Sequence, residues 1–109
     1  MPIPKPGKPV RGSTTGAPIM ALFDLLGRRW AMGAIWQLST GPLTFRALQE
    51  KCGNISPTIL NSRLKDLKDA RLIERTPTGY RLTPLGQSLF ALLEPFKAWA
   101  KDWTKTLGK

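Results

Sequence analysis

The sequence predicts a mainly α-helical domain that carries one small β-hairpin. Apolar residues recur at helical spacing over most of the chain, Gly and Pro interrupt them at short intervals, and two strand-like runs flank one tight turn. With 109 residues there is room for one domain with one core. Seventeen Lys and Arg against seven Asp and Glu give a net charge of +10, which suits a polyanionic partner or an anionic membrane surface.

Residues 1–16 are expected to form a flexible basic tail. They hold four Pro, three Gly and the basic residues Lys5, Lys8 and Arg11, with little apolar material to offset the entropy of ordering. The tail is either a terminal extension without a role or a basic arm that enters a DNA groove. The folded domain is expected at residues 17–107.

The first helix is predicted to begin at Pro18 and to end at Gly27 in a left-handed cap. A second helix is expected at about residues 28–39, where Gly41 and Pro42 stop it. These two helices supply the first part of the core.

Thr44 is the expected N-cap of a short third helix, and Leu43 before it is expected to bridge to the later hairpin. Phe45, Leu48 and Cys52 fall on one stripe of this helix. A buried, inert thiol is therefore favoured over a redox sensor. Because this is the single cysteine and the chain has no histidine, we expect no disulfide, no metal and no cofactor.

The helix that follows has the clearest start signal, Ser56 as N-cap with Pro57 at the first helical position. Leu60, Leu64 and Leu67 line one side. The opposite face and its flank are small and polar: Thr58, Asn61, Ser62, Lys65 and Asp69. Such a face fits the major groove of DNA, where Asn pairs with adenine and Thr or Ser touch bases or phosphate. An ordinary solvated face remains the alternative for this helix by itself.

Two strand-like segments, residues 72–76 and 80–83, are joined through residues 77–79, with Arg75 and Arg81 beside the turn. Two such arginines can straddle a phosphate backbone or reach the minor groove, although a solvated surface hairpin would look the same. A capped amphipathic helix that leads into a two-stranded ribbon is the DNA-reading half of a winged helix-turn-helix. Duplex DNA is therefore the expected partner.

The last helix is predicted to begin at Thr83 and Pro84 and to kink or break near Glu94, because Pro95 removes a helical donor. It carries a seven-residue apolar repeat: Leu85, Leu89, Leu92, Phe96, Trp99 and Trp103. A second apolar stripe lies beside it: Phe90, Leu93, Ala100 and Leu107. Since one small core needs only one stripe, we expect a partner chain to cover the rest.

In this order, the motifs resemble those of the HxlR-type winged-helix transcriptional regulators, relatives of the MarR-like group. They lie at residues 27–30, 41–48, 55–56, 60–64, 67, 80–83 and 86. The resemblance covers roughly residues 21–103. It implies a prokaryotic repressor or activator that is a homodimer built on the first and last helices, with the helix after Ser56 in the major groove and the hairpin as wing.

The expected site has two parts, a DNA-contacting surface and a dimer interface. The residues expected to contact DNA are Thr44, Arg46, Ser56, Pro57, Thr58, Asn61, Ser62, Arg63, Lys65, Arg75, Thr78 and Arg81. The residues expected at the dimer interface are Leu22, Phe90, Leu93, Trp99 and Trp103. Trp30 is expected in the core, whereas Trp36 fits an interface, the wall of an effector pocket or an exposed position equally well.

Three departures from the family matter. Residues 77–79 make a shorter wing than usual, Arg71 stands where the family often has Gly, so that the preceding helix would end without a left-handed cap, and no cysteine lies near the first helix. Some members of the family sense thiol-reactive compounds through a cysteine near the first helix. Because this chain has none there, thiol sensing is not carried over to it. The sequence does not identify any small-molecule effector.

Three other functional classes compete with a regulator. A non-specific architectural DNA-binding protein and a winged-helix module for protein interaction remain open, whereas an enzyme is disfavoured because the acidic residues are few and scattered. No stretch approaches the ~20 apolar residues of a membrane span. We therefore expect no membrane association and a cytoplasmic, nucleoid-associated protein.

Overall fold

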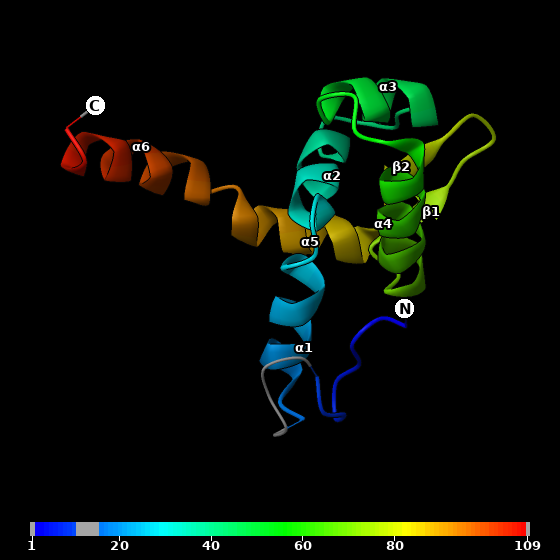
Figure 1. Ribbon diagram of the computed structural model, residues 1–109, viewed down its shortest axis with the longest axis horizontal. Coiled ribbons are helices and arrows are strands. Elements are labelled where there is room, and N and C mark those ends of the chain that lie inside the picture. Colours follow the sequence, from blue (N-terminus) through cyan, green and yellow to red (C-terminus); the bar gives the residue numbers. More distant parts are fainter. Residues whose placement is uncertain (1, 11–15, 109) are drawn as a thin grey trace.

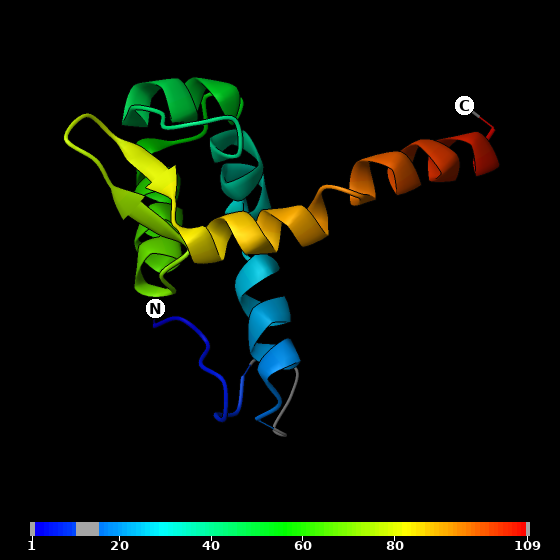
Figure 2. The same ribbon diagram turned by 180° about the vertical axis from the view of Figure 1, so that it is seen from behind.

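The computed structural model describes residues 2–10 and 16–108. The elements in chain order are α1 (Pro18–Leu26), α2 (Ala31–Leu38), α3 (Phe45–Lys51), α4 (Pro57–Asp69), β1 (Ile73–Arg75), β2 (Tyr80–Leu82), α5 (Pro84–Leu93) and α6 (Phe96–Thr106). Helices α2 to α4 pack together with the hairpin, while α1 and α6 project from this body in different directions (Figures 1 and 2). The predicted fold class, helices with one small hairpin, is confirmed.

The core lies where α2, α3 and α4 meet the hairpin. Its largest fully buried side chains come from each of these elements: Ile35, Leu38, Leu48, Leu60, Leu67 and Ile73. Cys52 is also fully buried, as its place on the apolar stripe predicts, and the half-buried ring of Trp30 packs against this cluster. The apolar side of α4 thus faces inward, which leaves its polar side toward solvent.

Side-chain caps define the helix starts that the sequence predicts. The hydroxyl oxygens of Thr44, Ser56 and Thr83 each accept a hydrogen bond, at 3.1 Å, from the backbone N–H three residues further on. The break expected near Glu94 is also confirmed, because α5 ends at Leu93 and α6 begins at Phe96. Local sequence signals therefore set these boundaries.

The connection between α1 and α2 differs from the prediction. Gly27 has a right-handed φ of −76°, and the left-handed residue is Trp30 with φ of 68°, so both the left-handed cap at Gly27 and the helix start near residue 28 are wrong. The Trp30 ring packs tightly over Gly33: a Cβ built there would lie 2.9 Å from it. This packing holds the Trp30 backbone in a conformation that its own side chain disfavours.

The end of α4 also adopts a left-handed conformation, at Arg71 with φ of 64°. The Arg71 N–H donates to the Lys68 carbonyl and the Leu72 N–H to the Leu67 carbonyl, both at 2.9 Å, which is the Schellman pattern. The expectation that this helix would end without a left-handed cap is wrong. Here these paired hydrogen bonds hold a residue with a Cβ at a position that favours glycine.

We expect Arg71→Gly to raise the free energy of unfolding by about 0.5 to 1 kcal/mol, because relief of left-handed strain outweighs the greater freedom of glycine in the unfolded chain. Urea denaturation measures the change. Arg71→Ala retains a Cβ and should show no comparable gain. Equal stabilisation by Gly and Ala would mean that the side chain of Arg71, not its backbone, is the unfavourable feature.

The hairpin is anchored to α3 by a one-residue bridge. Leu43 and Tyr80 exchange backbone hydrogen bonds of 3.0 and 2.8 Å, which confirms the bridge predicted at Leu43. A Cβ on Gly79 would lie only 2.1 Å from the Leu43 carbonyl oxygen, so the close approach requires glycine there. The turn of the hairpin consequently lies next to the N-terminus of α3.

The described part of the predicted tail, residues 2–10, touches the domain. Ile3 is half-buried against the core, and the guanidinium of Arg28 donates to the Pro2 carbonyl at 2.8 Å. The tail thus supplies more apolar anchoring than its composition suggested. Met1 and residues 11–15, with Arg11 among them, lie outside the described residues, and the flexibility and role expected of residues 1–16 stay predictions.

Candidate nucleic-acid interface

Helix α4 presents an exposed polar face. Thr58, Asn61, Ser62 and Lys65 are all exposed and lie away from the leucines that enter the core. Ser56 and Pro57, which begin the helix, are exposed as well. Helix α3, the start of α4 and the hairpin lie on one side of the molecule, far from the projecting α6 (Figure 1). This side therefore offers one continuous surface to a partner.

The other predicted DNA contacts flank that helix face. Thr44 and Arg46 lie at the start of α3, and Arg75, Thr78 and Arg81 lie on the hairpin, all with exposed side chains. The bridge between Leu43 and Tyr80 brings these two groups together, although they lie far apart in the chain. The residues predicted to contact the phosphate backbone of DNA thus lie on either side of α4, which is where such contacts are needed.

Several basic side chains of this surface already have a neighbour within the chain. Three of them form ion pairs with a carboxylate. Arg46 Nε lies 3.7 Å from Glu50 Oε1, Lys65 Nζ lies 3.1 Å from Asp69 Oδ2, and Arg81 Nη2 lies 2.6 Å from Glu74 Oε2. The guanidinium of Arg75 stands 5.6 Å from the centre of the Tyr80 ring. Glu50 and Glu74 were missed, and Asp69 was predicted on the polar face of α4 but not as a partner of Lys65. The helical i,i+4 spacing of two of these pairs is nevertheless visible in the sequence.

Arg63 is placed differently from the other candidates. Its Nη1 donates to Asp66 Oδ2 at 3.0 Å, and Arg28 Nη1 lies 3.1 Å from the same oxygen. The three side chains are only 20, 9 and 11 % exposed for Arg63, Asp66 and Arg28 respectively. This geometry does not support the DNA contact predicted for Arg63, because the residue faces the connection between α1 and α2 and is held there by a buried carboxylate.

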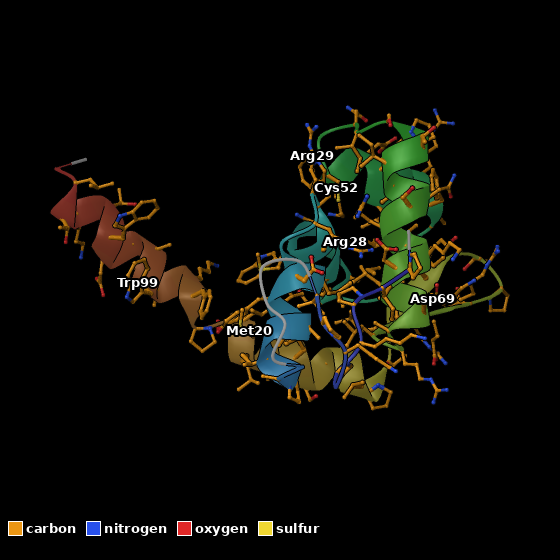
Figure 3. All side chains as sticks on the ribbon, turned by 60° about the horizontal axis from the view of Figure 1, so that its bottom comes forward. Met20, Arg28, Arg29, Cys52, Asp69 and Trp99 are labelled. Atoms are coloured by element: carbon orange, nitrogen blue, oxygen red, sulfur yellow. The ribbon has the colours of Figure 1, made fainter. Side chains whose placement is uncertain are left out.

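A second exposed surface runs along α5 and α6. Its large apolar side chains are between 53 and 73 % exposed: Leu85, Leu92, Phe96, Trp99, Trp103 and Leu107. The rings of Trp99 and Trp103 stack with centroids 6.2 Å apart. Figure 3 shows Trp99 on the part of α6 that projects away from the body. We call these six residues the apolar strip.

Some predicted interface residues lie in the core of the chain itself. Leu93 is 8 % exposed and belongs to the core, so the geometry does not support its predicted place at an interface. Phe90 is half-buried, and its ring packs edge-on against the ring of Trp36, with the two ring centroids 5.1 Å apart. Trp36 therefore packs between α2 and α5, an intrachain role that was not among its three expected ones. Leu22 on α1 is half-buried.

The described part of the chain has neither a cluster of metal ligands nor a membrane-spanning helix. No group of three or more His, Cys, Asp and Glu side chains there could hold a metal ion. No helix in the described ranges is long and apolar enough to span a bilayer. Burial raises the pKa of the Cys52 thiol, which lowers its reactivity as a thiolate.

A short helix, an N-capped helix with an exposed polar face and an attached β-hairpin define a winged helix-turn-helix, the fold of a large class of DNA-binding proteins. The model of one family, the HxlR-like helix-turn-helix, matches residues 25–107, and the chain belongs to that family. It is a transcriptional regulator with a DNA-binding helix-turn-helix, and not an enzyme.

Named relatives agree with this assignment. The chain is 35% identical over 99 residues to the HTH-type transcriptional regulator YodB of Bacillus subtilis, covering 84% of this chain and 88% of the relative. The crystal structure of quinone-bound YodB superposes with a TM-score of 0.71 at 36% identity, covering 77% of this chain and 96% of the other. A possible HxlR family factor from Thermoplasma volcanium gives 0.70 at 31% identity, covering 77% and 82%.

Proposed function

We propose that the protein reads a palindromic operator as a homodimer, with α4 of each protomer in the major groove. The exposed polar face of α4 carries this proposal. Asn61 and its neighbours Thr58, Ser62 and Lys65 are small or flexible enough to reach base edges and have the donors and acceptors that distinguish base pairs. The flanking residues of α3 and the hairpin would mainly contact the phosphate backbone of the DNA.

The apolar strip supports the homodimer. Six large apolar side chains along α5 and α6 form more exposed apolar surface than a monomer of this size needs, and an isologous interface would cover it. A two-fold axis would place the two α4 helices about 34 Å apart, in successive major grooves. The preferred site would then be a palindrome, bound in the cytoplasm at the nucleoid.

Regulation by thiol chemistry is not part of this proposal. A quinone-bound structure is known for YodB, whereas the single cysteine of this chain, Cys52, is fully buried. A buried thiol with a raised pKa is poorly suited to react with quinones. An effector, if the protein has one, would act at another place.

The decisive test compares a substitution at a base-contacting residue with one at a phosphate-contacting residue. On an operator selected from random duplexes, Asn61→Ala should weaken binding by about 1 to 3 kcal/mol, while binding to random DNA changes little. Arg81→Ala should weaken binding to both duplexes by similar factors, because phosphate contacts carry no sequence information. Fluorescence anisotropy at one fixed salt concentration measures both affinities.

Gln37→Ala on α2, a half-buried position outside the residues proposed to contact DNA, is the control for Asn61→Ala and should leave both affinities unchanged. If substitutions at Thr58, Asn61 and Lys65 each reduce binding to every duplex equally, α4 does not read sequence. A non-specific architectural role would then replace the proposed one.

A further inference from the structure

An open cleft of about 570 Å³ separates the connection between α1 and α2 from the side of α4. Arg28 and Arg29 line one wall, and Ser62 and Lys65 line the other. Figure 3 shows Arg28 beside α4, while Trp99 on α6 lies far from it. Because Ser62 and Lys65 also belong to the exposed polar face of α4, the cleft opens at the edge of the proposed DNA surface.

The cleft carries a surplus of positive charge. Its lining includes four basic side chains and two carboxylates, so the lining residues sum to +2 at neutral pH: Arg28, Arg29, Arg63 and Lys65 against Asp24 and Asp66. One oxygen of Asp66 serves two guanidinium groups, at 3.1 and 3.0 Å. In addition, the Nε of Arg63 is buried without a hydrogen-bond partner among the described residues. An anion is the ligand that such a wall favours.

Arg29 is the cation best placed to meet that anion. Its side chain is exposed, and none of the described residues forms a hydrogen bond or ion pair with it, whereas Arg28, Arg63 and Lys65 each have a carboxylate partner. The neighbouring residue Trp30 is packed against the core, so the backbone that carries Arg29 is anchored. Its guanidinium needs to break no contact with the described residues before it binds, and the anchored backbone adds no further cost of ordering the chain.

We infer that this cleft binds a phosphate group of the DNA backbone, at the edge of the groove that α4 enters, and this inference rests on the proposed DNA binding. Arg29 donates to the phosphate oxygens through its planar guanidinium, which suits a phosphate better than a lysine ammonium does. Ser62 adds a hydroxyl donor, and the buried group of Arg28, Arg63 and Asp66 holds the two walls together.

The test is the salt dependence of DNA affinity. Arg29→Gln should lower the slope of log affinity against log salt by about one unit per protomer and weaken binding at low salt by about tenfold. Arg29→Lys should keep most of the slope. The matched control is Lys97→Gln, which removes the same charge from α6 and should leave the slope unchanged. All variants should unfold at the same urea concentration as the wild type.

The possible outcomes separate phosphate binding in the cleft from DNA binding by the protein as a whole. If the wild type binds duplex DNA and Arg29→Gln alters the slope no more than Lys97→Gln, the cleft does not hold a backbone phosphate. Phosphorus NMR with inorganic phosphate tests the other source: binding of free phosphate that requires Arg29, with no Arg29 effect on the DNA slope, would overturn the DNA assignment. A wild type that binds no duplex would instead defeat the proposed function itself.

Discussion

Replacing Asp66 with alanine should destabilise the folded protein by about 3 to 5 kcal/mol, because two guanidinium groups would lose the one carboxylate between them. Arg28 and Arg63 approach that carboxylate at 3.1 and 3.0 Å in a region where the three side chains are at most 20 % exposed. Water cannot fully replace the lost partner there. The free energy of unfolding of a native protein is about 5 to 15 kcal/mol, so such a loss is a large fraction of it.

Urea denaturation monitored by circular dichroism measures the effect of Asp66→Ala. Asp66→Asn keeps the shape and one acceptor but loses the charge, so its cost should be smaller, roughly 1.5 to 3 kcal/mol. Asp69→Ala is the matched control, since Asp69 pairs with Lys65 on the surface and such pairs contribute roughly 0 to 1 kcal/mol. If Asp66→Ala costs no more than Asp69→Ala, the buried group contributes no net stability.

Trp103→Asp should raise the dissociation constant of the proposed homodimer about a thousandfold. A tryptophan near the centre of an interface commonly contributes at least about 2 kcal/mol, and two-fold symmetry counts the substitution twice, so the total is about 4 kcal/mol. The substitution should leave the fold intact, because no residue of α6 is buried within the protomer. Sedimentation velocity across a concentration series measures the dissociation, and far-ultraviolet circular dichroism checks the helical content.

Lys101→Asp serves as control for this experiment. It places a carboxylate on the same helix but about 200° around its axis from Trp103. It should leave the dimer largely intact. A wild-type protein that sediments as a monomer at micromolar concentration would contradict the homodimer, and the apolar strip would then need a different partner.

Much of the fold was predictable because its signals are local. The caps at Thr44, Ser56 and Thr83 act over three residues, and each of them is confirmed at 3.1 Å. The apolar spacing on α4 needs no knowledge of the rest of the chain, since side chains four positions apart lie on one helix face by geometry. The exposed polar face of α4, which carries the proposed function, follows from the same periodicity.

The surroundings of several site residues were not predictable, because distant segments create them. Arg63 reads as a surface arginine on a DNA-facing helix, and only the approach of Arg28, 35 positions earlier, turns Asp66 into a buried carboxylate that holds both. Trp36 had no clear role until α5 brought Phe90 against its edge. Periodicity describes one element and contains no information about which element packs on it.

By itself, the sequence determined the fold class, the helix boundaries at capped positions and the polar face of α4, because these follow from interactions between residues close in the chain. The tertiary structure decided which stripe of the last helices faces the core, with Leu93 buried and Leu92 73 % exposed. It also decided the left-handed backbones of Trp30 and Arg71. In each case packing and hydrogen bonds, acting on neighbours that the local pattern does not specify, outweigh the conformational preference of a single residue.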